Sequence, residues 1–330
     1  MSKIKVGIIG GAGYTAGELL RILLHHPDVE ISCIQSSSNA GQSVYSIHQD
    51  LFYSDDLMFN EKISDKADVY FLCKGHGQSF KILSEGQILT DKHIIDLSQD
   101  FRLTDTHPEI QKKYGRFIYG LPELQRSKIK KAKNIANPGC FATCIQLGIL
   151  PLATNNMINN DIHISAITGS TGAGQTLSST SHFSWRNNNV SVYKPFKHQH
   201  LSEIYQNIKN LQKNLSYKIH FIPYRGNFTR GIIATIYIDS DIKGSDAIDM
   251  YTEYYRNEPF VKISKDNIYL KQVINTNYGL IYINKIGAQL MIICVIDNLM
   301  KGASGQSVQN MNLMFDIDEK TGLNVKGSAF

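Results

Sequence analysis

The sequence has few of the features that mark secreted, membrane-spanning or metal-stabilised proteins. Its 5 cysteines are an odd number without C-x-x-C spacing, which argues against a disulfide framework and against a structural zinc site. No apolar stretch reaches the length of a membrane span, and the first residues lack the apolar core of a signal peptide. We therefore expect a soluble, cytoplasmic protein without a bound metal.

Neither basic nor acidic residues are in large excess. The chain carries 34 basic and 29 acidic residues, a net charge of +5 over 330 residues. Its longest basic run, residues 128–133, has no aromatic residue between the lysines and fits a solvated surface. The composition disfavours nucleic acid as a partner, whereas a small anionic substrate suits it. The length and a hydrophobic content of 42% favour two domains.

The first part of the chain alternates short apolar runs with helical patterns. Residues 5–10 form an apolar run closed by glycines, and the leucines of residues 14–25 recur at helical spacing. Further buried strands are expected at residues 29–34, 67–72 and 93–97. Such alternation predicts an α/β fold with a parallel sheet.

A second, α+β domain is expected beyond the helical segment 140–153. Its strands are predicted at residues 163–168, 217–223, 231–238 and 280–296, the last as a hairpin that turns around residues 284–287. A final apolar helix is expected over residues 302–315.

A glycine-rich turn joins the first strand to the first helix. It has the G-x-x-G-x-x-A spacing of a Rossmann-type turn, in which backbone N–H groups meet a pyrophosphate, and its residues are Gly10, Gly11, Ala12, Gly13, Tyr14, Thr15 and Ala16. The alternative is a tight βα turn without a ligand.

The end of the second strand favours NADP(H) over NAD(H). In NAD-specific folds a carboxylate there accepts the ribose hydroxyls, but residues 35–39 contain no acid. The hydroxyls of Ser36 and Ser38 can bind a 2′-phosphate without repelling it. An ordinary serine-rich loop is the alternative.

Cys140 is the candidate nucleophile. It follows Asn137-Pro138-Gly139 directly and begins an apolar helical run, where the positive helix end favours thiolate over thiol and N–H groups suit an oxyanion. The alternative is a buried structural cysteine. Cys144 lies on the same helix face, either as a resolving thiol or as a packing residue.

Two histidines are candidate proton donors. His198 and His200 stand just before or within a new helix, and an imidazole suits protonation of an alkoxide-like oxygen near neutral pH. Metal binding by H-x-H is the rival, but no third ligand lies at ligand spacing nearby. A surface position without a role is also open.

Three further segments are candidate anion sites. Arg102 follows a predicted strand at the sheet edge where α/β folds bind ligands, and its alternative is an ion pair with Asp100 or Asp105. Residues 168–175 form a loop of small residues whose exposed N–H groups suit an anion, or only a flexible turn. Arg230 is either an anion anchor or structural.

Eight segments, taken in order, resemble the N-acetyl-γ-glutamyl-phosphate reductases, relatives of aspartate-semialdehyde dehydrogenase. They are GIIGGAGYTAGEL, DLSQDFR, YGLPEL, NPGCFAT, GSTGAGQ, KHQHLSEI, GNFTRGI and DNLMKGASGQSVQNMN. The match runs through nearly the whole chain and is more specific than any glycine pattern. It departs from the family at Ala142 and Ser202, where proline is usual, and no reacting atom is lost.

The resemblance implies a fold and an assembly. A Rossmann-type NADP-binding domain would comprise residues 1–143 with 302–330. Residues 144–301 would form an α+β substrate and dimerisation domain of the semialdehyde dehydrogenase type. The protein would be a homo-oligomer, either a dimer or a tetramer.

The resemblance also implies the reaction. Cys140 would attack the γ-acyl phosphate of N-acetylglutamate, and NADPH would reduce the thioester to N-acetylglutamate semialdehyde in arginine biosynthesis. His200 would be the acid/base with His198 beside it, and Arg102 would meet the phosphate. Ser170, Gly172 and Gly174 would line the active site, whereas Asn298 and Gly302 would approach the nicotinamide.

Several alternatives stay open. Related enzymes accept N-succinyl or carrier-linked substrates, and aspartate-semialdehyde dehydrogenase runs the same chemistry on aspartyl phosphate. A non-catalytic NADP-sensing Rossmann protein is a rival of another class. Such a sensor would not require a reactive thiol at a helix start, so Cys140 would then be alkylated no faster than the other cysteines.

Overall fold

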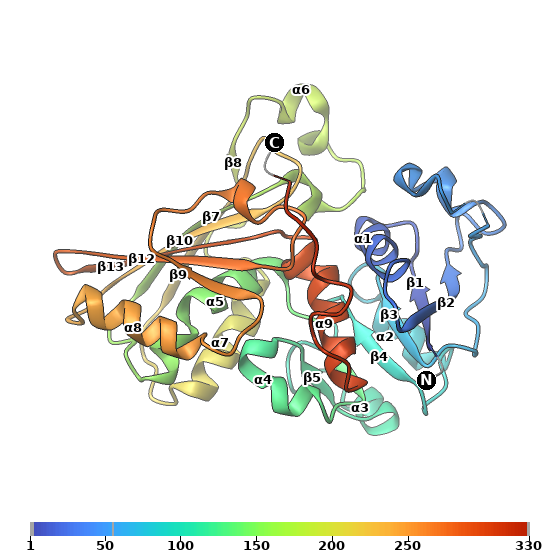
Figure 1. Cartoon of the computed structure of the whole chain (residues 1–330), viewed down its shortest axis with the longest axis horizontal. Coiled ribbons are helices and arrows are strands. Elements are labelled where there is room, and N and C mark those ends of the chain that lie inside the picture. The colour runs from blue at the N-terminus through green and yellow to red at the C-terminus, as the bar shows by residue number, and fades with distance from the viewer. Residues whose placement is uncertain (1–2, 55, 329–330) are drawn as a thin grey trace. The chain divides into compact units, whose positions relative to one another are not determined.

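The computed structural model describes residues 3–54 and 56–328 (Figure 1). Within these ranges the chain forms two sheets, each with its own helices. No helix of the described ranges is both long and apolar enough to cross a membrane.

Two compact units divide the chain. Among the described residues, the first contains those up to Gly139 together with Ala303–Asn324, and the second contains Cys140–Gly302 and residues 325–328. The domain bounds expected from the sequence, residues 1–143 with 302–330 and residues 144–301, stay a prediction.

Among its described residues, the first unit holds a six-stranded parallel sheet of order β2-β1-β3-β4-β6-β5. The strands are β1 (Ile4–Ile9), β2 (Val29–Gln35), β3 (Val69–Leu72), β4 (His93–Asp96), β5 (Phe117–Tyr119) and β6 (Asn134–Ala136). All four residues of β3 are buried, as is usual for a parallel sheet with both faces covered. The expected parallel α/β sheet is therefore confirmed.

The helices of the first unit bury apolar stripes against this sheet. They are α1 (Tyr14–Leu23), α2 (Gln78–Ser84), α3 (Pro108–Tyr114), α4 (Pro122–Ile129) and α9 (Gly305–Met314), with the short turns η1 (Val44–Ser46) and η2 (Gln49–Leu51). In α1 the buried leucines are Leu19, Leu20 and Leu23, the residues whose spacing predicted the helix. Helix α9 packs on α1 and α4, so the segment Ala303–Asn324 completes the unit.

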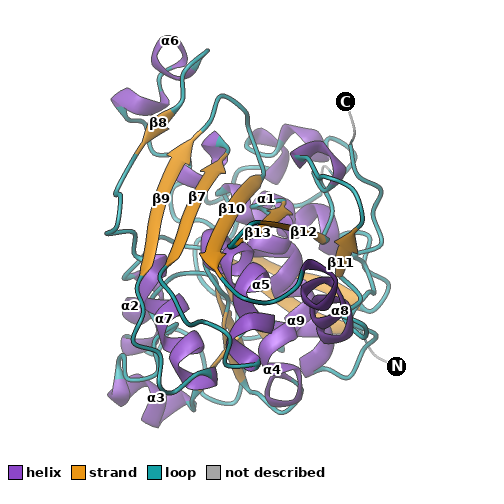
Figure 2. Ribbon diagram, turned by 90° about the vertical axis from the view of Figure 1, so that its left-hand side faces the viewer, coloured by secondary structure: helices purple, strands orange, loops and turns teal. Residues whose placement is uncertain are grey.

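In the described part of the second unit, seven strands form a mixed sheet of order β11-β12-β13-β10-β7-β9-β8. They are β7 (Ile162–Thr168), β8 (Ser191–Val192), β9 (Ile219–Arg225), β10 (Ile232–Asp239), β11 (Val261–Ser264), β12 (Gly279–Ile286) and β13 (Gln289–Ile296). Figure 2 shows β9, β7 and β10 side by side. The β12–β13 hairpin was expected to turn at residues 284–287; it turns at Gly287, with a φ of 58°.

The helices of this unit hold its core. They are α5 (Cys140–Thr154), α6 (Phe183–Arg186), α7 (His200–Leu211) and α8 (Gly244–Tyr254), with the short helical turns η3 (Ser170–Ala173), η4 (Ser179–Ser181), η5 (Leu270–Gln272) and the π-helical η6 (Met300–Ser304). Helix α5 packs on β10, β12 and β13 and also contacts α7 and α8. The last helix was expected to begin at residue 302. A π-helical turn occupies that position instead, and α9 begins at Gly305.

Candidate active site

Cys140 is the first residue of a helix that is otherwise almost wholly buried. Every residue of α5 from Phe141 to Ala153 is buried, whereas Cys140 is partly exposed. The packing of α5 holds the helix firmly, and the first N–H groups of a helix have no acceptor within it. The thiol therefore stands at the positive end of a rigid helix, on a residue that is partly exposed.

Cys144 occupies a different environment. It is fully buried, and its thiol donates a hydrogen bond to the backbone oxygen of Cys294 at 3.3 Å. Burial raises the pKa of Cys144 well above its ordinary value. This arrangement fits the packing interpretation rather than that of a resolving thiol.

The segment that ends at Gly302 lies directly against the nucleophile. A Cβ atom at Gly302 would stand 2.9 Å from the Cβ and 3.3 Å from the Cα of Cys140. Only glycine allows this approach without a shift of one backbone or the other. The structure therefore brings together two residues that the sequence placed at the site.

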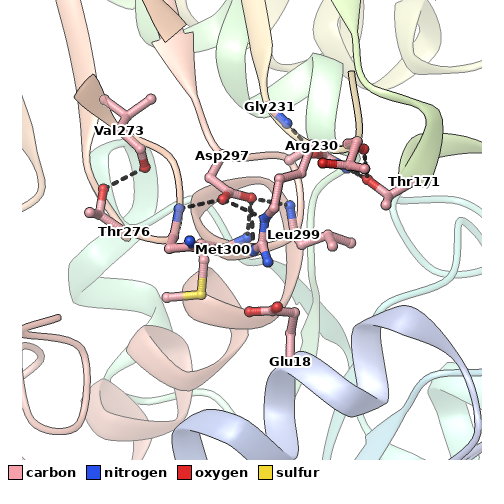
Figure 3. A network of polar contacts seen from close by, with 12 residues as sticks. Glu18, Thr171, Arg230, Gly231, Val273, Thr276, Asp297, Leu299 and Met300 are labelled. Carbon is pink, nitrogen blue, oxygen red and sulfur yellow. Dashed lines mark hydrogen bonds and ion pairs between the residues drawn. The ribbon is translucent and has the colours of Figure 1, made fainter. Parts of the chain in front are cut away.

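One buried carboxylate fixes the start of this segment (Figure 3). Asp297 is fully buried and accepts two hydrogen bonds from Arg230, Nε to Oδ2 at 2.8 Å and Nη2 to Oδ1 at 3.2 Å. It also accepts from the backbone N–H groups of Asn275, Leu299 and Met300, at 2.7, 2.9 and 3.2 Å. A buried ion pair such as Arg230–Asp297 is stable when charge-assisted hydrogen bonds engage its polar atoms. Arg230 thus binds a protein carboxylate, and contact with substrate stays a prediction.

Asn298 ties this segment to two neighbouring loops. Its side-chain oxygen accepts from the backbone N–H of Gly231 at 2.6 Å, and its amide nitrogen donates to Thr171 Oγ1 at 3.1 Å. The segment at residues 298–302 is therefore held at both ends. Asp297 and Asn298 fix its start, and the contact of Gly302 with Cys140 fixes its end.

The small-residue loop at residues 168–175 differs from expectation in one respect. Its exposed N–H groups were expected to bind an anion, but those of residues 169–172 and 174 all donate to backbone carbonyls, partly within the loop and partly to residues 228–231. These donors are engaged in holding the two loops together. Any contact of Ser170, Gly172 or Gly174 with substrate would have to use other atoms, and it stays a prediction.

Both histidines lie against the start of α5. The rings of His198 and His200 are buried, with centroids 4.5 Å apart. The His198 ring is 5.4 Å and the His200 ring 6.3 Å from the ring of Phe141, the residue after Cys140. The fold thus gathers on one helix end two candidate acids and a candidate nucleophile that are about 60 residues apart in sequence.

The two imidazoles differ in their electrostatics. Burial, with the positive charges of Lys194 and Arg225, lowers the pKa of His198 to about 4. Its Nδ1 also accepts a hydrogen bond from the backbone N–H of His200 at 3.2 Å, so it is neutral near neutral pH with the proton on Nε2. His200 Nε2 instead lies 4.0 Å from the Glu203 carboxylate.

Metal binding was the rival interpretation of the two histidines. Within the described ranges, no group of three or more His, Cys, Asp or Glu side chains is arranged to hold a metal ion.

Sequence reasoning missed three side chains that form a series of contacts starting at His198. Tyr193 lies with its ring 5.8 Å from that of His198, and the Arg225 guanidinium stacks on the Tyr193 ring at 4.7 Å. Arg186 donates to the backbone oxygen of Arg225 at 2.8 Å. The one available signal was that Arg225 stands directly before the segment GNFTRGI.

In the first unit, the glycine turn has the geometry of a pyrophosphate site. Gly10 has a φ of +84°, and a Cβ at Gly11 would stand 2.5 Å from Ile34 Cγ2, so both positions require glycine. Gly13 caps α1 without a side-chain hydrogen bond, and the first turn carries no acid. The N–H groups of residues 14–16 therefore face outward from a helix start, as phosphate binding requires.

A cavity of about 500 Å³ opens at the ends of β2 and β3 in the same unit. Its lining includes Gln35 and Ser37 together with Lys62, Lys74 and Lys81, although Glu61 and Glu85 also reach it. Of the serines singled out, Ser36 is buried and Ser38 hydrogen-bonds Asn39, so Ser37 lines the cavity instead. Lysines here suit the extra phosphate of NADP(H).

Arg102 braces the turn that leads to the nucleophile. It is buried, and its guanidinium donates to the backbone oxygens of Asn137 at 2.9 Å and Leu97 at 3.0 Å. Asp100, one of its expected ion-pair partners, accepts instead from the backbone N–H groups of Gly77 and Phe80 at 2.7 and 3.0 Å.

Asp96, which precedes Arg102 in the same segment, predicts a pH dependence of stability. Burial raises its pKa from 3.8 to about 6, although Ser79 and Ser98 donate hydrogen bonds to it. The folded state thus binds the proton more tightly than the unfolded state. The stability that this carboxyl contributes is therefore present at low pH and is lost as pH rises through about 6. We expect the stability of the wild type relative to Asp96→Asn to fall by about 1 kcal/mol between about pH 5 and about pH 7.

The measurement is urea unfolding of both proteins at the two pH values. Asp96→Asn is its own control, because it keeps the shape of the side chain and removes the titration. A difference in stability that does not change with pH, or that grows toward neutral pH, would contradict the assignment.

Comparison with known proteins agrees with both units. Residues 5–132 match the family described as semialdehyde dehydrogenase, NAD binding domain, and residues 140–298 match semialdehyde dehydrogenase, dimerisation domain. The chain is 53% identical to an N-acetyl-gamma-glutamyl-phosphate reductase of Phocaeicola vulgatus, over 99% of this chain and 100% of the relative. It is 54% identical to one from Bacteroides thetaiotaomicron, with the same coverage.

Solved structures show a similar fold at low sequence identity. Aspartate semialdehyde dehydrogenase II from Vibrio cholerae superposes with a TM-score of 0.71 at 13% identity, covering 96% of this chain and 99% of that chain. Aspartate semialdehyde dehydrogenase with NADP from Candida albicans gives a TM-score of 0.64 at 13% identity, with coverage of 95% and 99%.

Proposed function

We propose that this chain, which belongs to the N-acetyl-γ-glutamyl-phosphate reductase family of semialdehyde dehydrogenases, reduces N-acetyl-γ-glutamyl phosphate to N-acetylglutamate semialdehyde and phosphate in arginine biosynthesis. The observation that carries the proposal is the partly exposed thiol of Cys140 at the start of buried α5, with two histidines and Gly302 against the same helix end. A non-catalytic NADP sensor has no use for that arrangement.

Cys140 is the proposed nucleophile. Its thiolate attacks the γ-carbonyl of the acyl phosphate, a sulfur–carbon bond forms, and phosphate leaves with the electrons of the broken carbon–oxygen bond. The helix start stabilises the thiolate, and its N–H groups suit the oxyanion that develops on the carbonyl oxygen. The enzyme then carries a thioester on Cys140.

His200 is the proposed acid/base, with His198 beside it. After reduction of the thioester, the oxygen of the thiohemiacetal exchanges a proton with an imidazole as the aldehyde and the Cys140 thiolate form. His198 resists protonation because its pKa is lowered to about 4 and its Nδ1 already accepts a hydrogen bond. His200, with the Glu203 carboxylate 4.0 Å away, suits the role better.

NADPH is the proposed cofactor and, when bound, supplies the hydride. The residues proposed to hold it are Gly10, Gly11, Ala12, Gly13, Tyr14, Thr15 and Ala16 at the pyrophosphate, Ser37 with the lysines of the 500 Å³ cavity at the 2′-phosphate, and Asn298 and Gly302 at the nicotinamide end. Open N–H groups at the start of α1 and the cations near β2 support this assignment.

Five residues are proposed to contact the substrate: Arg102, Ser170, Gly172, Gly174 and Arg230. Arg102 stands at the turn before Cys140, which favours it for the phosphoryl group. Arg230 donates a hydrogen bond to Asp297, so we propose two roles for it. It would position the segment at residues 298–302, and it would attract the anionic substrate.

A homo-oligomer is the proposed assembly, either a dimer or a tetramer, in the cytoplasm. The second unit matches a dimerisation domain, and part of its sheet presents aromatic and apolar side chains over β7, β9 and β10. His163, His220 and Tyr237 stack there at 4.9 and 5.0 Å, and Tyr237 is 42% exposed. A second copy of the chain is the partner that this surface suits.

The test of the function is phosphate-dependent reduction of NADP by aldehydes offered side by side. We expect N-acetylglutamate semialdehyde or its N-succinyl analogue to give the highest kcat/KM, and aspartate semialdehyde to react at least about 10²-fold less well, because its chain is shorter by one methylene and lacks the acyl group. Preference for aspartate semialdehyde would overturn the assignment, and so would turnover that does not depend on phosphate.

A further inference from the structure

Two arginines of the second unit are joined to each other, and one of them, Arg225, contacts Tyr193 next to His198. Arg186, in α6, is buried and fully engaged: it donates to the backbone oxygen of Thr180 at 3.3 Å, to Ser191 Oγ at 3.3 Å and to the backbone oxygen of Arg225 at 2.8 Å. Its pKa is lowered by burial and by the nearby charge of Arg225. Arg186 therefore joins the loop before β8 to the end of β9.

Arg225 is different, because part of its guanidinium has no partner. It is the last residue of β9 and stacks on the Tyr193 ring, with its Cζ 4.7 Å from the centroid. Its Nε atom is buried, and no acceptor among the described residues meets it. A buried cationic donor without an acceptor is unfavourable, and an anionic ligand would supply what is missing.

Tyr193 links Arg225 to the surroundings of the nucleophile, because its ring lies 5.8 Å from that of His198, which in turn lies 5.4 Å from the ring of Phe141. Burial raises the pKa of Tyr193 to about 12, while the Arg225 charge lowers it and the Cys140 thiolate raises it. Both groups therefore lie within electrostatic reach of the same phenol. The charge of Arg225 also contributes to the lowered pKa of His198.

Three cationic side chains lie in this part of the second unit. Arg186, Arg225 and Lys194 gather here, and no carboxylate of the described residues forms an ion pair with any of them. Lys194 donates to the Gln199 side chain at 3.3 Å. Like charges placed together without an acid are costly unless an anion binds among them.

We propose that Arg225 binds a carboxylate of the substrate, with Arg186 as a positioning residue that holds its backbone. This inference rests on the proposed function and names the residue that recognises the non-reacting end of the substrate. The contacts that lead from Arg225 to Phe141, the residue after Cys140, run through the rings of Tyr193 and His198. A carboxylate several bonds from the reacting carbonyl suits a cation at the far end of those contacts, and guanidinium and carboxylate pair through two parallel hydrogen bonds.

Two carboxylates can fill this role. One is the α-carboxylate of the glutamyl group, which every N-acylglutamyl phosphate carries. The other is the terminal carboxylate of a dicarboxylic acyl group, such as succinyl, on the substrate nitrogen.

The experiment compares wild type, Arg225→Met, Arg225→Lys and the matched control Arg256→Met, an exposed arginine of the same unit. Phosphate-dependent oxidation is measured with N-acetylglutamate semialdehyde, its α-carboxamide and N-succinylglutamate semialdehyde. We expect Arg225→Met to raise KM for the recognised aldehyde about 10- to 100-fold, with kcat and the KM for phosphate little changed. Arg225→Lys should recover part of the loss.

The substrates distinguish the two carboxylates. If the α-carboxylate is bound, the carboxamide should show no difference between wild type and Arg225→Met. If the acyl carboxylate is bound, the wild type should prefer the N-succinyl aldehyde and Arg225→Met should lose that preference. An unchanged KM for all aldehydes, or a rise in the KM for phosphate alone, would overturn the proposal.

A second readout does not depend on turnover. N-acetylglutamate and N-succinylglutamate should slow alkylation of Cys140 by iodoacetamide, and Arg225→Met should need about 10- to 100-fold more of the protecting acid. If no aldehyde is oxidised but protection depends on Arg225, the proposed function fails and the inference stands. If the aldehydes react and neither readout responds to Arg225→Met in a variant that melts like the wild type, the inference fails alone.

Discussion

Cys140→Ser is expected to lower kcat/KM by about 10⁴-fold or more while leaving NADPH binding unchanged. Serine keeps the size of the side chain, but its hydroxyl is far less ionised than a thiol at a helix start and forms an ester rather than a thioester. The measurement is aldehyde oxidation with phosphate and NADP, together with the change in NADPH fluorescence on binding.

Alkylation provides the matching control. Iodoacetamide should label Cys140 first in the wild type, because Cys144 is buried with a raised pKa and burial raises the pKa of Cys73 to about 12. Mass spectrometry of the labelled peptides reports the order. Labelling spread evenly over the 5 cysteines, or a serine variant that retains near-normal turnover, would remove the covalent route.

His200→Asn is the second large expected effect, a loss of about 10²- to 10⁴-fold in kcat. Asparagine keeps a polar side chain of similar reach but cannot exchange a proton with the thiohemiacetal oxygen. Cys140 should still react with iodoacetamide in this variant, because alkylation needs the sulfur and no proton donor. The measurement is therefore paired: turnover falls and alkylation persists.

His198→Asn is the control for that assignment. Because His198 is neutral and hydrogen-bonded through Nδ1 to the backbone of His200, its replacement should disturb the neighbouring residue and cost less activity. An equal or larger loss from His198→Asn alone would transfer the acid/base role to His198.

The elements with long apolar patterns could be predicted from the sequence. Strand β2 and helix α5 fall where residues 29–34 and 140–153 indicated them, because their patterns are local. Strands β5, β6 and β8 have three, three and two residues, too few to show an alternation, and the sequence argument did not find them. Their places depend on pairing with neighbours in the sheet.

Residues of the candidate site could be predicted only where a single short segment indicates their role. Cys140 after Pro138-Gly139 and the turn from Gly10 are of this kind. The bond from Arg186 to Arg225 joins residues 39 apart and depends on how β8 pairs with β9, which no local pattern reveals.

The same limit applies to Arg230. The sequence left open whether this arginine was an anchor for a ligand or a structural residue. Its partner Asp297 lies 67 residues away, so the pairing of the two could not be read from either segment. The π-helical turn at Met300–Ser304 contains Gly302, whose contact with Cys140 likewise joins residues far apart in the sequence.

The burial of α5 separates the residue that reacts from the residues proposed to recognise the substrate. Its sulfur is carried by a helix that the core holds on all sides, so the reacting atom keeps its place whatever happens at the periphery. Arg225 and Tyr193, by contrast, stand at strand ends joined to a peripheral loop. Substitutions there can redirect the enzyme toward a differently acylated amino acid without retuning the chemistry, which makes this rim the place to begin redesigning selectivity.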